Sequence, residues 1–190
     1  MTSPRSPLWR RPVRGDAGAA AITAVAWIGT FYLNEWAFAA AERTHFVNLI
    51  FLPAGVRILA VLIVGWPAAV GLFLGSVLTA APIWHLPAAL IPGLISALGP
   101  AAAVGVGTRS MRLRDDLKGI TPRQIAIISI TDGVFNAVPS NLFFWLQHRV
   151  ATPWRDVAPM FVGDLLGTAA LLYLAGVGLR LLLRWRQQWR

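Results

Sequence analysis

Six stretches of roughly 20 mostly apolar residues follow one another along this chain, and they restrict its fold more than any other feature. They cover residues 17–38, 46–64, 67–84, 86–107, 124–146 and 159–183. A helix of about 20 residues crosses the roughly 30 Å core of a bilayer. Charged residues make up only 13% of the chain, against about 25% in soluble domains. We therefore predict an all-α fold, a polytopic transmembrane helix bundle of about six spans.

Basic residues gather in three segments, which predicts the orientation of the chain. The segments lie before the first span, between the fourth and fifth, and after the sixth, and six spans place all three on one side. They hold 13 of the 17 lysines and arginines: Arg5, Arg10, Arg11, Arg14, Arg109, Arg112, Arg114, Lys118, Arg123, Arg180, Arg184, Arg186 and Arg190. The positive-inside rule then predicts a multi-pass protein of the bacterial inner (plasma) membrane with both termini cytoplasmic, N-in and C-in.

The same distribution predicts the domain organisation and the general partners. Residues 1–16 form a cytoplasmic basic segment, 17–183 the transmembrane domain, and 184–190 a cytoplasmic basic tail. The net charge of +9 is confined to the ends of apolar stretches, so it indicates topology and contact with membrane lipid, and we expect no nucleic acid partner.

Four ionisable residues fall inside predicted spans, where each costs roughly 2.5–3.5 kcal/mol on insertion scales. They are Glu35, Arg57, Asp132 and Asp164. One interpretation is structural: Arg57 pairs with Asp132 or Asp164 and holds the bundle together. The other is functional: a polar pocket in which Arg57 meets an anionic group, or in which the acids handle protons or a cation. The two interpretations are compatible, and the sequence leaves both open.

Further polar residues concentrate in the halves of the spans that face the periplasm. Asp132, Asn136 and Ser140 recur every fourth residue and therefore share one face of the fifth span. Pro53, close to Arg57, predicts local unwinding of the second span. We predict a polar cavity that faces the periplasm and forms a ligand-binding or buried polar network. Its floor is Arg57, Asp132 and Asp164, and nearer its rim lie Glu35, Asn48, Asn136 and Asn141.

The sequence offers little that favours catalysis. Cysteine is absent, which excludes disulfides and thiolate chemistry. Phosphate-binding glycine loops, metalloprotease helix pairs and nucleophile elbows are not recognisable. The three histidines, at 45, 85 and 148, fall in predicted connections and are typical of the membrane interface. We expect neither enzymatic activity nor a cofactor or bound metal.

Two stretches resemble a known family. Residues 48–57, Asn-Leu-Ile-Phe-Leu-Pro-Ala-Gly-Val-Arg, continue through Gly65-Trp66-Pro67 to Gly-Leu-Phe-Leu-Gly-Ser at 71–76. Residues 161–167 read Phe-Val-Gly-Asp-Leu-Leu-Gly. In this order they resemble the first type of membrane-associated sensor (MASE) domain, over most of the chain from about residue 48 to 183. The resemblance implies a membrane fold and a sensory role. Members usually precede a signalling output domain; we expect this chain to carry none of its own and to act through a separate partner protein.

Two alternatives to a sensor remain open. The substrate-binding S component of an energy-coupling-factor vitamin transporter has about six helices and docks its partner through small residues on its first helix. The pairs Ala17/Ala21 and Ala20/Ala24 match that pattern, although such pairs usually serve helix packing. The other alternative is a membrane adaptor or assembly factor. Co-purification separates the three, because each predicts a different partner.

Overall fold

The structure is a computed structural model that describes residues 15–38, 42–44, 47–111, 113 and 120–188. The predicted cytoplasmic segment 1–16 lies almost wholly outside the described residues, as does most of the basic connection before residue 120. The elements are α1 (Asp16–Phe38), β1 (Glu42–Thr44), β2 (Val47–Asn48), α2 (Pro53–Val64), α3 (Trp66–Trp84), α4 (Leu90–Ser110), α5 (Pro122–Leu146) and α6 (Val157–Gln188). The prediction of an all-α bundle is confirmed, since the strands form only a short antiparallel hairpin.

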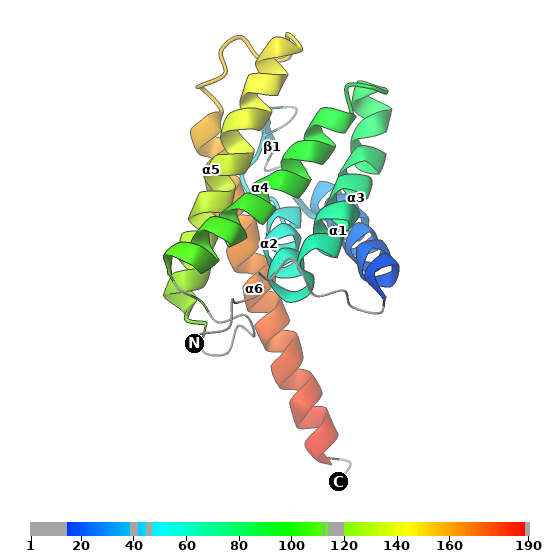
Figure 1. Ribbon diagram of the computed structural model, residues 1–190, viewed down its shortest axis with the longest axis vertical. Helices are drawn as coiled ribbons and strands as arrows, with labels where there is room; N and C mark the ends of the chain where they lie inside the picture. Colours follow the sequence, from blue (N-terminus) through cyan, green and yellow to red (C-terminus); the bar gives the residue numbers. More distant parts are fainter. Residues whose placement is uncertain (1–14, 39–41, 45–46, 112, 114–119, 189–190) are drawn as a thin grey trace, which may run out of the picture.

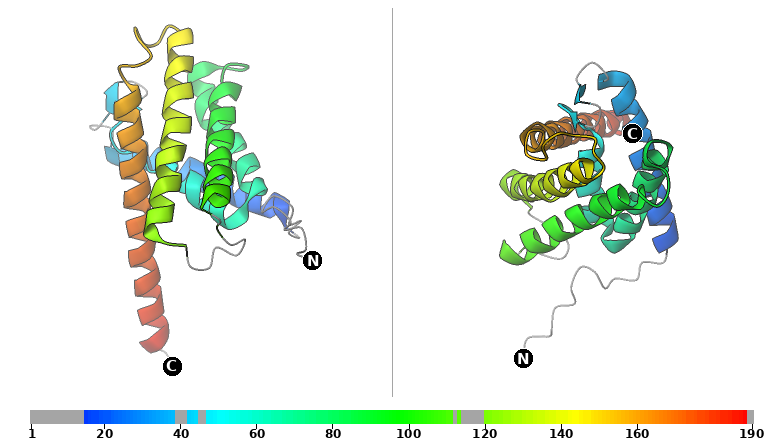
Figure 2. Two further views of the ribbon diagram at one scale, coloured as in Figure 1. Left: turned by 60° about the vertical axis from the view of Figure 1, so that its left-hand side comes forward. Right: turned by 90° about the horizontal axis from the view of Figure 1, so that it is seen from above.

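Five helices, α1, α3, α4, α5 and α6, are long and apolar enough to cross a membrane. Each of these helices is as long as a bilayer core is thick, and each exposes apolar side chains such as leucine, valine and isoleucine. The chain is therefore a multi-pass membrane protein. Figure 2 (right) shows them following one another in the order α1, α3, α4, α5, α6, with each packed on the next. Helix α1 crosses obliquely to the others (Figure 2, left).

The second predicted span, residues 46–64, is wrong in its first half. Helix α2 has only 12 residues, about 18 Å of helix, and begins at Pro53. Pro53 has no N–H to donate to a preceding turn, so the helix starts there rather than continuing upstream. The unwound part, 47–52, satisfies its backbone elsewhere: the Leu52 N–H donates to Asn34 Oδ1 at 2.8 Å, and the Phe51 N–H donates to the Gly163 carbonyl at 3.0 Å.

Helix α2 lies at the centre of the bundle, in contact with α1, α3, α4, α5 and α6 (Figure 1). Seven of its 12 residues are buried. The 47–52 segment bonds to α1 on one side and α6 on the other, so it fills the gap between the first and last long helices. Residues 47–52, which the predicted span would have continued as helix, are therefore not helical.

Small residues set the close contacts. Gly71 and Gly75 of α3 lie against the backbone of Ala20 and Ala24 on α1, where a Cβ on either glycine would meet the α1 carbonyls. Gly65 joins α2 to α3 with φ 80°, a left-handed conformation that favours glycine. Helix α5 runs continuously through Pro139, which lies inside it.

Helix α6 is the longest element, at 32 residues, and its second half continues beyond the other helices (Figure 1). It runs through the predicted domain boundary at residue 183 as far as Gln188. Its end lies opposite the α3–α4 and α5–α6 connections, which share the upper end of the bundle in Figure 1.

Candidate functional site

Three charged side chains from three helices meet inside the bundle. Arg57 comes from α2, Asp132 from α5 and Asp164 from α6. Arg57 Nη2 lies 3.2 Å from Asp132 Oδ2 and 2.9 Å from Asp164 Oδ2. Each residue is at most 2% exposed. One guanidinium nitrogen thus serves two carboxyl groups, and the charge of Arg57 is offset within the cluster.

Asn136 extends this cluster by one helical turn. It lies four residues after Asp132 on the same face of α5, and its Nδ2 donates to Asp164 Oδ2 at 2.8 Å. Asp164 Oδ2 therefore accepts from both Arg57 and Asn136. Some buried polar atoms have no hydrogen-bond partner in the described part of the chain: Arg57 Nε, Asp132 Oδ1 and Asp164 Oδ1. The cluster is well connected but keeps unused hydrogen-bonding capacity.

Glycines allow these elements to approach. Gly163 and Gly167 lie against the backbone of Asn48 and Phe51, so that a Cβ on either would overlap a carbonyl group of the unwound segment. These two glycines flank Asp164 in sequence. The close approach of α6 to the 47–52 segment brings Asp164 within reach of Arg57, which follows that segment in the chain.

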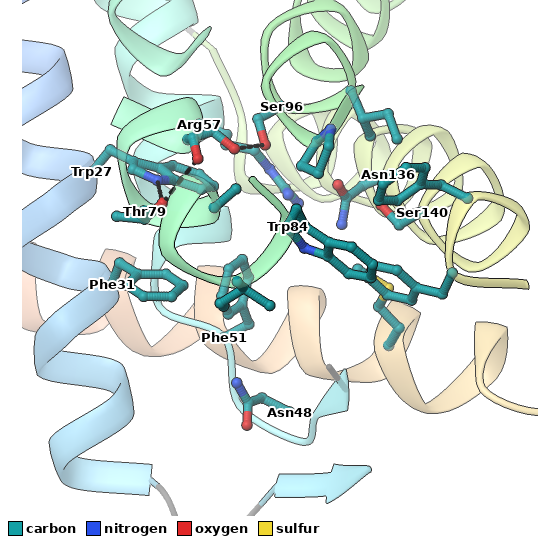
Figure 3. A pocket seen from close by; sticks show the side chains of 18 of the residues that line it. Trp27, Phe31, Asn48, Phe51, Arg57, Thr79, Trp84, Ser96, Asn136 and Ser140 are labelled. Carbon is teal, nitrogen blue, oxygen red and sulfur yellow. Dashed lines mark hydrogen bonds between the residues drawn. The ribbon is translucent and has the colours of Figure 1, made fainter. Parts of the chain in front are cut away.

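A pocket of about 160 Å³ lies next to the cluster, in the half of the bundle beyond the N-terminal end of α2. It is lined by the upper parts of the long helices and by the unwound segment (Figure 3). Six of its lining residues are aromatic: Trp27, Phe31, Phe51, Trp84, Phe143 and Phe144. Its polar lining residues are Glu35, Asn48, Arg57, Ser76, Thr79, Ser96, Asn136 and Ser140.

One polar wall of the pocket is already hydrogen-bonded. The Trp27 indole N–H donates to Thr79 Oγ1 at 3.2 Å, and the Ser96 hydroxyl donates to Ser76 Oγ at 3.1 Å. Thr79 in turn donates to α3 backbone carbonyls. These bonds, drawn in Figure 3, fix α1, α3 and α4 around the pocket rather than offering free groups to a ligand.

The opposite wall is aromatic. The Trp84 and Phe144 rings are parallel within 3°, with centroids 5.8 Å apart, and Phe143 lies against Trp84 at 4.9 Å. The guanidinium of Arg149, in the α5–α6 connection, lies 5.2 Å from the centre of the Trp84 ring. The aromatic wall is therefore in contact with the α5–α6 connection through Arg149.

The predicted site residues do not all lie where the predicted floor and rim of the cavity would place them. Arg57 lines the pocket, whereas Asp132 and Asp164 lie behind it and do not. Asn136 belongs to the buried cluster rather than the rim. Glu35 and Asn48 do lie at the edge, where Asn48 Nδ2 donates to Glu35 Oε1 at 3.5 Å.

Asn141 is separate from the pocket lining. Its Nδ2 donates to the Ala137 carbonyl at 2.9 Å and to Met160 Sδ at 3.3 Å, so it joins α5 to α6. Among the residues that the structure describes, no group of three or more histidine, aspartate or glutamate side chains is placed to hold a metal ion.

The sequence pattern did not reveal the aromatic lining. Trp84 is at the end of a span, and its position is equally typical of an interfacial belt. Trp27 carried a usable signal, because a tryptophan near the middle of a span lies away from that interface; it is only 3% exposed. Ser76 and Thr79 in α3 and Ser96 in α4 were the other signal, as hydroxyls in otherwise apolar helices.

No family model, curated protein or solved structure matches this chain. A function is therefore proposed from the site alone.

Proposed function

We propose that this membrane protein is a receptor that binds a small molecule in the pocket above Arg57 and acts through a separate partner protein. The observation that carries the proposal is the pocket itself. Six aromatic and eight polar or charged residues line it, including Asn48 and Phe51 of the unwound segment before α2. Lining a space with aromatic walls and a few convergent polar groups is typical of sites for small ligands.

The position of the pocket supports an outward-facing site. It lies in the half of the bundle near the α3–α4 and α5–α6 connections, opposite the basic end of α6. By the positive-inside rule the basic end is cytoplasmic, so the pocket opens toward the periplasm of a bacterial inner membrane. A receptor in this orientation samples molecules outside the cytoplasm.

The contacts between the two family-like stretches support a MASE-type sensor in particular. Residues 48–57 and 161–167 pack on each other through Gly163 and Gly167, and Arg57 pairs with Asp164 across them. The first of these stretches lines the pocket through Asn48, Phe51 and Arg57, and the second packs behind it. A sensor of this kind passes its signal to an output, which we place in the partner protein.

The transporter alternative loses one of its supports. Ala20 and Ala24 are covered by Gly71 and Gly75 of α3, so that pair serves packing within the bundle. Only the Ala17/Ala21 pair remains exposed on α1. Co-purification of an ATPase module would favour the transporter over the sensor.

Cysteine labelling tests whether the pocket is an accessible, water-filled site. The chain has no cysteine, so each variant carries a single thiol. Ser140→Cys places it in the pocket, and Ser129→Cys is the matched control: the same change, on the same helix, at a buried position outside the pocket. The probe is the charged, membrane-impermeant reagent sulfonatoethyl methanethiosulfonate.

We expect Ser140→Cys to react at least about tenfold faster than Ser129→Cys, because a thiolate forms and reacts only where water reaches it. The rates are measured by intact-protein mass spectrometry. Equal, slow modification of both variants would mean that the pocket is closed and that the receptor proposal is wrong.

A further inference from the structure

We infer that the pocket selects an uncharged, flat, single-ring molecule whose polar edge carries both a hydrogen-bond donor and an acceptor. This inference rests on the proposed function and adds the class of ligand to it. A primary carboxamide on an aromatic ring is the simplest molecule of that class.

An anion is disfavoured by the partners that Arg57 already has. Its Nη2 contacts Asp132 and Asp164, so the positive charge is compensated before a ligand arrives. A carboxylate or phosphate entering the pocket would bring a third negative charge to a cluster that is almost completely buried. A buried charge is tolerated only when it is paired with an opposite charge, and Arg57 is already paired with the two aspartates.

A cation is disfavoured for the opposite reason. Arg57 lines the pocket, whereas the two aspartates lie behind it, so an ammonium group at the floor would face the guanidinium first. The one other charged lining residue in the described part of the chain is Glu35. Glu35 is exposed at the rim, where water screens its attraction for a cation.

The unused hydrogen-bonding groups at the floor define the polar edge of the ligand. Arg57 Nε–H lacks a partner among the described residues, but this atom is fully buried and is not available to a ligand in the pocket. Asn136 uses its Nδ2 on Asp164, which leaves its Oδ1 as an acceptor, and the Ser140 hydroxyl can serve as either. A group with a carbonyl and an N–H side by side complements this set, whereas a purely apolar ring would leave it unsatisfied.

The volume and the walls define the ring. A cavity of roughly 150 Å³ accommodates benzene in a protein interior, and this pocket measures about 160 Å³. The parallel Trp84 and Phe144 rings and the neighbouring Phe143 favour a flat partner, which contacts aromatic faces and edges over most of its surface.

Three probes of nearly the same shape test the inference: benzamide (neutral), benzoate (anionic) and benzamidine (cationic). Each is added to the purified full-length Ser96→Cys protein, which keeps Asn136 and Ser140, and its protection of the thiol from sulfonatoethyl methanethiosulfonate is measured. Ser76→Cys, on the α3 side of the same pocket, is the second reporter in case the first variant folds poorly. Ser129→Cys controls for effects of the probes on the reagent or the detergent.

We expect benzamide to protect with a dissociation constant on the order of millimolar, as for a small fragment. Labelling should slow by roughly tenfold at about ten times that constant. Benzoate and benzamidine should bind at least about tenfold more weakly, since each places an uncompensated charge in the site.

The outcomes separate this inference from the proposed function. Protection by benzoate or benzamidine equal to that by benzamide would overturn the charge argument. A reactive Ser96→Cys that none of the probes protects would overturn the ligand class while leaving an accessible pocket. If Ser140→Cys and Ser96→Cys are both as unreactive as Ser129→Cys, the pocket is closed, and the inference fails together with the receptor proposal.

Discussion

Arg57 is a fully buried arginine in an apolar helix, and its position is tolerable only because carboxylates from two other helices reach it. Removing one partner from a buried ion pair costs about 3–5 kcal/mol, because it leaves an uncompensated charge. The three residues are not equivalent in this respect. Arg57 is shared by Asp132 and Asp164, whereas each acid has only the guanidinium as its charged partner.

Arg57→Met should therefore destabilise the protein more than Asp132→Asn. The first change leaves two carboxyl groups buried without a cation, and we expect it to lower the free energy of unfolding by about 3–5 kcal/mol. The second leaves the Arg57–Asp164 pair, whose atoms lie 2.9 Å apart, and we expect a loss of about 1–2 kcal/mol. Unfolding by SDS in mixed micelles measures both.

Arg180→Met is the matched control, because Arg180 is exposed near the end of α6. That change should alter the free energy of unfolding by less than about 0.5 kcal/mol. Equal losses for Arg57→Met and Asp132→Asn would show that the guanidinium is not shared between the two acids.

What the sequence could predict at this scale follows from the cost of charge in hydrocarbon. That rule identifies Arg57, Asp132 and Asp164 as residues in need of partners. It does not say that both acids share one nitrogen of Arg57, because that depends on how closely α6 approaches the unwound segment. The aromatic lining was missed since Trp84 satisfies the interfacial pattern equally well.

At the scale of elements, the unwound segment before α2 matters most. Residues 46–64 contain enough apolar side chains for a full span, and hydropathy counts side chains only. The backbone decides otherwise, because Asn34 on α1 and Gly163 on α6 supply acceptors for N–H groups that a helix would have bonded internally. Such long-range acceptors cannot be read from a local pattern. Asn48 and Phe51 of this unwound segment line the pocket.

Gly163→Ala and Gly167→Ala should each destabilise the protein by at least about 1–3 kcal/mol, through overpacking. The added Cβ would overlap backbone carbonyls of Asn48 and Phe51, which cannot move as a flexible side chain would. The measurement is again unfolding in mixed micelles. The Ser140→Cys labelling rate adds a second readout, because displacing the unwound segment changes the pocket wall.

Two glycines on the same helix provide the control. A Cβ added at Gly176 or Gly178 would have no atom of the described residues within 4 Å, so alanine there should be neutral or stabilising by up to about 1 kcal/mol. If alanine at Gly163 and Gly167 is tolerated as well as at these two positions, α6 does not pack closely on the unwound segment.

At the scale of the whole molecule, the connections sort into two ends. The α3–α4 and α5–α6 connections share the end nearer the pocket, and the end of α4, the start of α5 and the end of α6 lie at the other (Figure 1). The number and position of the long helices could largely be predicted from the sequence, since each apolar stretch has the length of a bilayer. Their order around α2 could not, because it depends on contacts between distant segments such as α1 with α3.

This sorting gives a test of both the fold and the orientation. Four exposed positions each receive a single cysteine: His85→Cys and His148→Cys at the pocket end, and Ser110→Cys and Gln187→Cys at the other. In spheroplasts, an impermeant maleimide should label the first pair only, and the second pair after the membrane is opened, because the basic end is retained in the cytoplasm. The reversed result would invert the orientation but preserve the fold, since each pair still behaves as a unit. If only one member of a pair is labelled, the arrangement of the helices is contradicted, and the pocket with it. The five long helices could then not cross the membrane in a way that brings Arg57, Asp132 and Asp164 together at one depth.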